Sequence, residues 1–254
     1  MVNIEELRKK YNQINKAPGS GDSADFLKKF LMMEEGTTQV RVLPAKDPDE
    51  NFYAETGIHR INDKNHHCPR VKGDDCPICD LSFKLWNTKD EGNMAIARQI
   101  KARKRFYLNA VERETGDVKI LSVGIKLFSK ILDCFFDDDF GDITDLKVGN
   151  DFKIVKDKSG EWPNYDKSAP KPIKSEAGSD MEVATWMDSL HDIQGLVKVA
   201  TYEDLKKMAM EITGDDIVEQ VRTIATATTS TTETTPETTS EEGADYLSHL
   251  KGLE

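Results

Sequence analysis

The chain has 254 residues, of which 37% are hydrophobic and 32% charged, which suits one sizeable domain with unstructured appendages. No apolar run approaches the roughly 20 residues needed to cross a bilayer, and Met1 to Glu6 lack a signal-peptide core. This predicts a soluble, cytoplasmic protein, where clustered cysteines bind metal more often than they form disulfides. The net charge of −11 argues at first against a polyanionic partner, but the charges are segregated along the chain.

The first predicted elements are an arm and a linker. Residues 3–15 carry acids early and bases late, as a short helix prefers, and the bases include Arg8, Lys9 and Lys10. Residues 17–23 are rich in glycine, serine and proline, which predicts a flexible linker. We therefore expect residues 1–20 to be an arm outside the core.

The body of the chain, from about residue 25 to 213, is predicted to be α+β and mainly β. Alternating and β-branched residues predict strands, with a hairpin turn at 114–117; they lie at 37–44, 52–61, 105–111, 118–123 and 151–156. Apolar residues at a 3.6-residue period predict helices after Cys76 and at 125–136, 181–190 and 202–212. The segment 26–33 is ambiguous between helix and strand.

Three of the four cysteines, Cys68, Cys76 and Cys79, are clustered in the sequence. A C-x-x-C turn directs two thiolates at one tetrahedral Zn²⁺, and the start of the helix that follows stabilises them. A histidine would complete the ligand shell, and three candidates stand upstream of the turn, namely His59, His66 and His67. The fourth cysteine, Cys134, lies on the apolar side of its predicted helix and is expected to pack in the core.

The pattern around the predicted zinc site favours a structural metal over a catalytic one. A zinc deaminase carries His-x-Glu upstream and Pro-Cys-x-x-Cys downstream, with the glutamate moving protons. Here Arg60 and Ile61 follow His59, Asp75 precedes Cys76, and the chain has no His-Glu-x-x-His pair. We therefore expect a closed site that holds the fold together.

A basic stretch follows the zinc-site helix and runs into two aromatic residues. Nine lysines and arginines face three acidic residues between Arg98 and Lys130. Cations bind phosphates through counterion release, and bases stack on aromatic rings for roughly 1–3 kcal/mol each. This combination is typical of a non-specific binder of single strands, although a solvated charged face would have the same composition.

The aromatic residues have open alternatives. Strand alternation places Phe106 and Tyr107 on opposite faces, so one of them is expected to pack inward. Trp86 and Phe128 could each be core or cleft wall. Trp162 and Tyr165 lie in a Gly- and Pro-containing segment, which predicts exposed rings that are available for stacking.

The C-terminal segment is predicted to be a flexible acidic tail. Residues 223–240 are almost entirely threonine, alanine, serine, glutamate and proline, which cannot form a core. From Gly214 onward nine acidic residues face two basic ones. Residues 244–250 form a short amphipathic patch, either a frayed end or a docking peptide for a partner.

These motifs, in this order, resemble the single-stranded-DNA-binding (helix-destabilising) proteins of T-even-type bacteriophages, the gene 32 protein family. The likeness covers essentially the whole chain; it is carried by His59, Cys68, Cys76-Pro-x-Cys79, the run ending in Arg105-Phe106-Tyr107, and Ser159-Gly160-x-Trp162-x-Asn164-Tyr165-Asp166. The resemblance implies an OB-fold core at 21–217 with an inserted zinc subdomain at about 55–95. It also implies a cooperativity arm at 1–20 and an acidic tail at 218–254.

The resemblance further implies roles for individual residues. One structural Zn²⁺ would be held by His59, Cys68, Cys76 and Cys79. Phosphates would meet four cations, Lys101, Arg103, Lys104 and Arg105. The base-binding side would be lined by five aromatic residues, Trp86, Phe106, Tyr107, Trp162 and Tyr165. Arg8, Lys9 and Lys10 would drive self-association along the DNA.

We therefore predict a non-enzymatic protein that coats single-stranded DNA cooperatively and with little sequence preference. By the resemblance, it would act in phage DNA replication, recombination and repair in the host cytoplasm, remove secondary structure, and recruit replication and recombination proteins through its tail. The alternatives are a zinc-ribbon adaptor that binds proteins alone and, with less support, a zinc-dependent nucleic-acid enzyme. Failure to bind oligo-dT would favour the adaptor, and DNA cleavage or deamination abolished by chelation would favour the enzyme.

Overall fold

The computed structural model describes residues 22–160 and 162–212. Two compact units divide the chain, Met1–Met208 and Ala209–Glu254, and all the named strands and helices lie in the first. The predicted arm, with Arg8, Lys9 and Lys10, and the predicted tail both lie outside the described residues. The division into arm, core and tail therefore stays a prediction.

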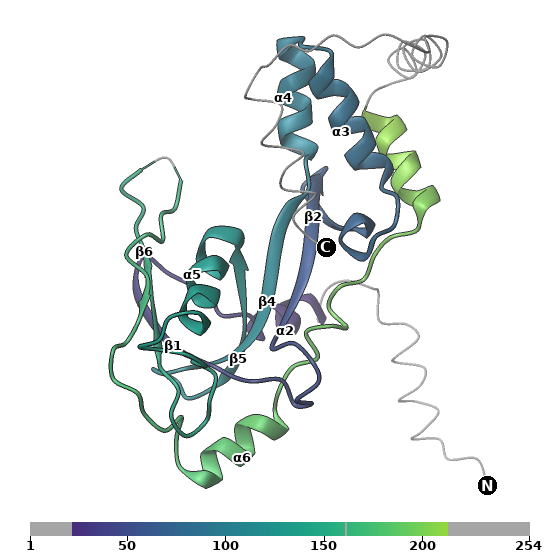
Figure 1. Cartoon of the computed structure of the whole chain (residues 1–254). Coiled ribbons are helices and arrows are strands. Elements are labelled where there is room, and N and C mark those ends of the chain that lie inside the picture. Colours follow the sequence, from purple (N-terminus) through teal and green to yellow (C-terminus); the bar gives the residue numbers. More distant parts are fainter. Residues whose placement is uncertain (1–21, 161, 213–254) are drawn as a thin grey trace, which may run out of the picture. The chain divides into compact units, whose positions relative to one another are not determined.

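One antiparallel sheet forms the centre of the first unit (Figure 1). Its seven strands are β1 (Gly36–Val42), β2 (Tyr53–Ile61), β3 (Lys64–Cys68), β4 (Arg103–Glu112), β5 (Val118–Gly124), β6 (Phe152–Lys156) and β7 (Ala169–Pro170). The long strand β4 pairs with β5 along one edge. Its other edge is shared, because β2 pairs with residues 103–108 and β1 with residues 110–112.

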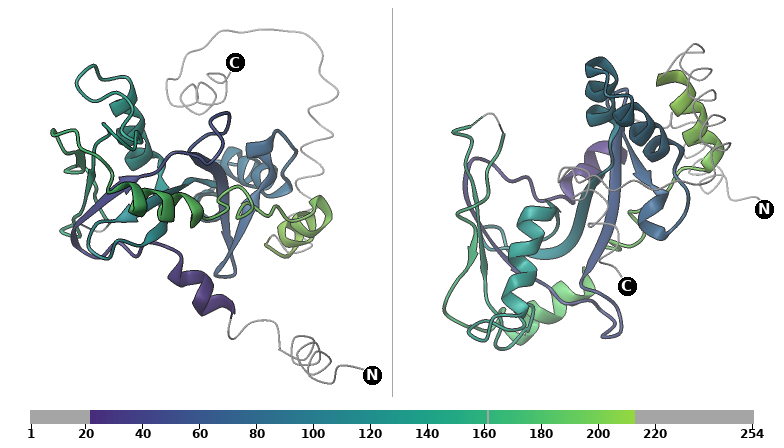
Figure 2. Two further views of the ribbon diagram at one scale, coloured as in Figure 1. Left: turned by 90° about the horizontal axis from the view of Figure 1, so that it is seen from below. Right: turned by 45° about the horizontal axis from the view of Figure 1, so that its top comes forward.

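Helices cover the sheet and extend from it. They are α2 (Asp22–Lys28), the short η1 (Pro69–Lys72), α3 (Pro77–Asn87), α4 (Glu91–Ile100), α5 (Ile125–Phe135) and α6 (Asp180–Asp188), and residues 202–212 are also helical. Helices α3 and α4 lie side by side near the ends of β2 and β4 (Figures 1 and 2), and the Ser82 hydroxyl donates to the Ala97 carbonyl between them at 3.0 Å. Across the described residues, no helix has both the length and the apolar character to traverse a membrane.

The core forms on both faces of β4. On one face Phe106 packs with Leu108 and with α5, and its ring stacks on Phe128 with centroids 3.8 Å apart. On the other face Tyr107 packs with Ala54 and Ile120. Cys134 is buried in the cluster that contains Phe106, which confirms its predicted packing role.

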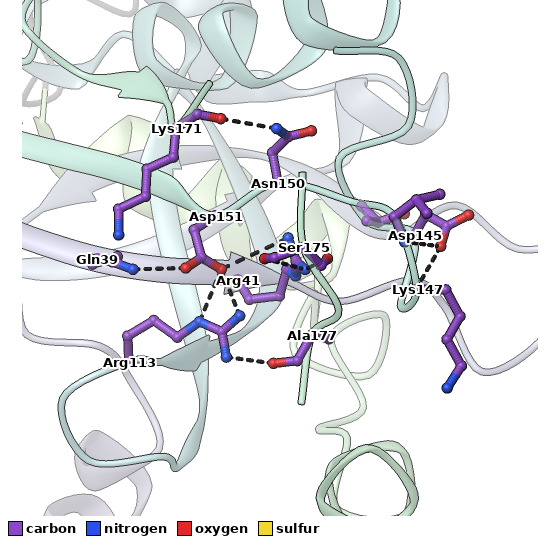
Figure 3. A network of polar contacts seen from close by, with 12 residues as sticks. Gln39, Arg41, Arg113, Asp145, Lys147, Asn150, Asp151, Lys171, Ser175 and Ala177 are labelled. Carbon is purple, nitrogen blue, oxygen red and sulfur yellow. Dashed lines mark hydrogen bonds and ion pairs between the residues drawn. The ribbon is translucent and has the colours of Figure 1, made fainter. Parts of the chain in front are cut away.

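A partly buried ionic network around Asp151, the residue before β6, joins β1, the end of β4 and the segment after β7 (Figure 3). Asp151 accepts from Arg113 Nε at 2.9 Å and Nη2 at 2.6 Å, and from Gln39 Nε2 at 2.7 Å. Arg41 is fully buried; its Nη1 lies 3.7 Å from the Asp151 carboxylate, and its Nη2 donates to the Ser175 carbonyl. Burial lowers the pKa of Arg41, and the Asp151 charge opposes that shift. Asp151 is thus the main counter-charge for this buried guanidinium.

The fold class is confirmed as α+β with a mainly antiparallel sheet. The five predicted strands, the hairpin turn and the helices α3, α5 and α6 are all present, with ends shifted by a few residues. The ambiguous segment 26–33 is partly each, since α2 ends at Lys28 and Phe30 then forms a bridge to Ile120.

Four elements were not predicted, namely β3, η1, α4 and β7. Strand β3 has the sequence Lys-Asn-His-His-Cys, with no apolar alternation, and it pairs with β2. The turn between the two strands consists of Asn62 and Asp63, whose φ angles are 49° and 58°. Asparagine and aspartate tolerate this left-handed region, as tight hairpins require. Helix α4 begins with Asp90 accepting from the Asn93 amide at 2.9 Å, which is a helix cap. The segment was missed because it contains few large apolar residues.

Candidate metal centre and nucleic-acid interface

The four predicted metal ligands come together from three elements. His59 projects from β2, Cys68 ends β3, and Cys76 and Cys79 belong to the turn and first residues of α3. Their ligand atoms all lie within 4.8 Å of one another, and three of the four residues are buried. The hairpin β2–β3 and the helix α3 therefore meet at one site that could hold a metal ion.

The spacing of the donor atoms fits a tetrahedral ion. Cys68 Sγ lies 3.5 Å from Cys79 Sγ, and His59 Nε2 lies 3.3 Å from Cys76 Sγ and 3.6 Å from Cys79 Sγ. A tetrahedral zinc shell with ordinary bond lengths separates its ligands by about 3.5–3.8 Å. His59 Nδ1 lies 2.7 Å from the Ile100 carbonyl, so Nδ1 carries the proton and Nε2 offers its lone pair to the site. The donor set and its tautomer both suit Zn²⁺.

The strand register shows which of the three histidines belongs to the cluster. His67 faces the other side of the β2–β3 hairpin, where its Nδ1 lies 2.8 Å from the Thr56 hydroxyl. His66 pairs with His59 across the hairpin and is only half-buried, outside the group of four. His59 is therefore the histidine of the cluster.

The histidine and the cysteines of the cluster shift one another's pKa values in the protein by itself. In the protein by itself, burial disfavours the charged His59 ring, but hydrogen bonds with the neighbouring cysteines outweigh burial and raise its pKa to about 10, so Nε2 holds a proton that a bound metal ion would displace. Hydrogen bonds with Cys68 and Cys79 lower the pKa of Cys76, whereas those with Cys68 and Cys76 raise the pKa of Cys79. Soft sulfur donors that crowd one point in this way are what a bound cation would neutralise.

A glycine permits the close approach of the ligand strands. Gly57 pairs with Cys68, and a side-chain carbon at residue 57 would lie 3.0 Å from Cys68 Cβ, 3.3 Å from Val71 and 3.5 Å from Ala102. The first two distances are tight, so a larger residue would push Cys68 away from His59. Gly57 is a site-supporting residue that the sequence pattern did not reveal.

The predicted basic residues begin β4 immediately after the α3–α4 pair. Arg103, Lys104 and Arg105 are all exposed, and Lys101, also exposed, caps the end of α4. Lys104 Nζ forms an ion pair with Glu55 on β2 at 3.0 Å. The first three residues of β4 therefore present cations to solvent, while most of the strand that follows is buried.

The predicted aromatic residues differ in exposure. Phe106 and Tyr107 are 5% and 7% exposed, so both pack in the core, where only one was expected to, and their contact with DNA stays a prediction. Trp86 is 38% exposed, with the Arg98 guanidinium 5.1 Å from its ring centroid. Trp162 is 71% exposed in the β6–β7 loop. Phe128, left open between core and cleft wall, is core.

Tyr165 packs the β6–β7 loop against the core. Its ring is half-buried against the cluster that contains Phe106; burial raises its pKa, and the nearby Arg105 cation opposes the rise. Lys130 on α5 donates to the Asp166 carbonyl in the same loop at 3.0 Å. The β6–β7 loop and the α3–α4 pair both project toward the same end of the sheet (Figures 1 and 2). Lys130 and Glu55 are neighbours of these residues that sequence reasoning missed.

The chain matches a known protein family. Residues 34–213, more than half of the chain, match the family model described as gp32 DNA binding protein like. None of the curated proteins compared with the chain matches it. The matched range contains the whole Cys/His cluster and all of β4.

Proposed function

Because the chain belongs to the gp32 DNA binding protein-like family, we propose that it binds and coats single-stranded DNA with little sequence preference. The observation that carries this proposal is the run of three consecutive exposed cations, Arg103, Lys104 and Arg105, at the start of β4. Such a row binds any phosphate backbone through counterion release. Rings beside it add stacking energy for every kind of base.

The exposure of each residue indicates whether it would contact phosphates, contact bases or stay in the core. Lys101, Arg103, Lys104 and Arg105 are exposed and would contact phosphates, whereas Trp86, Trp162 and Tyr165 present ring surface to bases. Phe106 and Tyr107 are buried, so they would fix the position of the start of β4, where the cations lie. Preferential binding of single strands pulls transient openings of a duplex apart by mass action, which removes hairpins.

The metal in this proposal is one structural Zn²⁺ held by His59, Cys68, Cys76 and Cys79. All four tetrahedral positions are then protein ligands, which leaves no open position for substrate or water. Zinc would supply cross-linking of the β2–β3 hairpin to α3, within a zinc subdomain at about 55–95. This donor set favours a non-enzymatic role over a zinc-dependent nucleic-acid enzyme.

The remaining roles in the proposal come from the family. Residues 1–20, with Arg8, Lys9 and Lys10, would drive cooperative self-association along the DNA. The acidic tail at 218–254 would contact replication and recombination proteins. The protein would then act at replication forks in the cytoplasm of a phage-infected cell.

Replacing Arg103 and Lys104 together with alanine is expected to flatten the dependence of log affinity on log salt for oligo-dT. Each phosphate contact to a single strand contributes about 0.7 to this slope, so losing two contacts lowers it by roughly 1.4. A fluorescence titration across ionic strengths measures the slope. Lys147→Ala, at an exposed lysine on another part of the chain, is the control. An unaltered slope in the double variant would remove these residues from the interface.

Replacing Glu55 with glutamine is expected to tighten oligo-dT binding. Glu55 competes with phosphate for Lys104, so a strand that binds Lys104 must first break a partly exposed ion pair worth about 0.2–1 kcal/mol. The variant removes this cost, which raises the affinity roughly 1.5- to 5-fold. The gain should disappear in a Lys104→Ala background, because the competition is then gone. Weaker binding by Glu55→Gln would show that the pair positions Lys104 rather than masks it.

A further inference from the structure

An ion pair joins the two segments that supply the sulfur ligands of the cluster. Arg70 lies on η1, two residues after Cys68, and Asp80 lies on α3, directly after Cys79. Arg70 Nη2 donates to Asp80 Oδ1 at 2.6 Å. The same two segments bring Cys68 Sγ to 3.5 Å from Cys79 Sγ. The segment after β3 and the start of α3 are therefore linked both by the ligands and by this pair.

The pair belongs to the least buried part of the metal centre. The other three ligands are buried, whereas Cys79 is only partly buried. The side chains of Arg70 and Asp80 are 41% and 47% exposed, so they too lie where the centre meets solvent. Cys79 is thus the ligand that solvent, a chelator or a thiol reagent reaches first, and the pair is attached to its neighbour in the chain.

The Arg70 cation also interacts with the charges of the cluster. Burial by itself would lower the pKa of Arg70, but the hydrogen bond to Asp80 and the charges of Cys79, Asp80 and Cys76 raise it. The attraction is mutual, so the guanidinium favours the charged form of these sulfur atoms. A Zn²⁺ ion with three thiolates and one neutral imidazole carries one net negative charge, which a nearby cation stabilises.

We propose that Arg70, held in place by Asp80, is a positioning residue of the metal centre that secures the Cys79 ligand and retains the ion. We call this ion pair the clamp. The inference rests on the proposed function, because it requires a Zn²⁺ held by the cluster. Without Arg70, the Asp80 carboxylate would add an unpaired negative charge directly after Cys79, and like charges disfavour the thiolates. The cation of the clamp therefore matters more than its partner.

Competition between a chelator and the full-length, zinc-loaded protein measures how tightly the ion is held. We expect Arg70→Gln to weaken zinc binding roughly 10-fold, the lower end of the range for residues that support metal ligands, because the clamp is partly exposed. Asp80→Asn should lose less, since it leaves the cation near the thiolates. Arg70→Lys should retain most of the affinity, since lysine keeps the charge and can donate to Asp80.

The matched control is Arg60→Gln, which breaks the exposed Arg60–Asp63 pair at 3.1 Å. Arg60 directly follows the ligand His59, but its pair joins residues of one hairpin and does not link two ligand segments. Zinc affinity in this variant should equal that of the wild type. A loss as large as that of Arg70→Gln would overturn the clamp.

Alkylation by iodoacetamide shows where the clamp acts. In zinc-loaded Arg70→Gln, we expect mass spectrometry to find a faster first modification at Cys79, while Cys68 and Cys76 stay as protected as in Arg60→Gln. Equal acceleration at all three cysteines would indicate general loosening and overturn the clamp. Wild-type protein that binds no zinc would overturn the proposed metal centre itself. Zinc-loaded wild type, together with unchanged zinc affinity and unchanged Cys79 modification in Arg70→Gln, would overturn the clamp alone.

Discussion

Replacing Asp151 with alanine is expected to lower the free energy of unfolding by about 3–5 kcal/mol, the usual cost of removing one partner from a buried ion pair. Arg41 has no exposed surface and would lose its main counter-charge. Arg113 would lose both of its hydrogen bonds to the carboxylate, and Gln39 would lose its acceptor. Among the described residues, buried Arg41 already has Nε and Nη1 without hydrogen-bond partners, and without Asp151 only the smaller effect of the Asp145 charge would still favour the charged guanidinium.

Denaturant unfolding followed by circular dichroism would measure this change. The matched control is Asp180→Ala, which breaks the Lys147–Asp180 pair at 2.7 Å on an exposed surface and should change stability little. Asp151→Asn keeps the shape of the side chain and two acceptor lone pairs, so it should fall between wild type and alanine. Equal stability of Asp151→Ala and Asp180→Ala would contradict the central role of Asp151 in the network.

This network could not have been predicted from the sequence. Arg41 stands between Val40 and Val42, so alternation correctly places it on the opposite face from the two valines. On most sheets that face is solvated. Here the segment that contains Ser175 and Ala177 covers it, and this long-range contact leaves no trace in the residues near Arg41.

The elements with strong local signals were predictable, whereas those specified by pairing were not. The Cys-x-x-Cys turn and the period of Ile78, Leu81 and Leu85 are by themselves sufficient to predict α3. Strand β3 is recognisable only beside β2, since its polar residues become a strand by hydrogen bonding to that partner. The β4–β5 hairpin has both a local sequence signal and a paired partner strand nearby in the sequence, and its strand ends were predicted within two residues.

The metal site and the aromatic residues show the same division. Cysteine spacing predicts three ligands, but the choice of His59 over His67 depends on which face of the β2–β3 hairpin each occupies. Likewise, alternation correctly puts Phe106 and Tyr107 on opposite faces of β4, but it cannot tell that both faces are covered. Burial of a strand face is decided by what packs on it, which a single strand's sequence does not encode.

Replacing Cys76 with serine, or removing metal with a chelator, is expected to abolish bound zinc and to lower the free energy of unfolding by about 4–5 kcal/mol or more, the range typical of losing a structural metal. The reason is that His59, Cys68 and Cys79 would then face one another without a cation, and the β2–β3 hairpin would lose its cross-link to α3. The loss should be largest in the α3–α4 pair, because the cluster around Phe106 and Phe128 packs on α5 and contains no metal ligand.

Metal analysis and the emission of Trp86, which lies on α3, would report this loss together. Cys134→Ser provides the matched control, since it changes a buried cysteine outside the cluster and should leave the zinc content at its wild-type value. DNA affinity should fall along with the zinc, because Arg103 begins β4 directly after the helix pair that the metal anchors. Full zinc content in Cys76→Ser would refute the ligand assignment. Zinc loss with unchanged oligo-dT affinity would instead separate the metal centre from the DNA-binding surface.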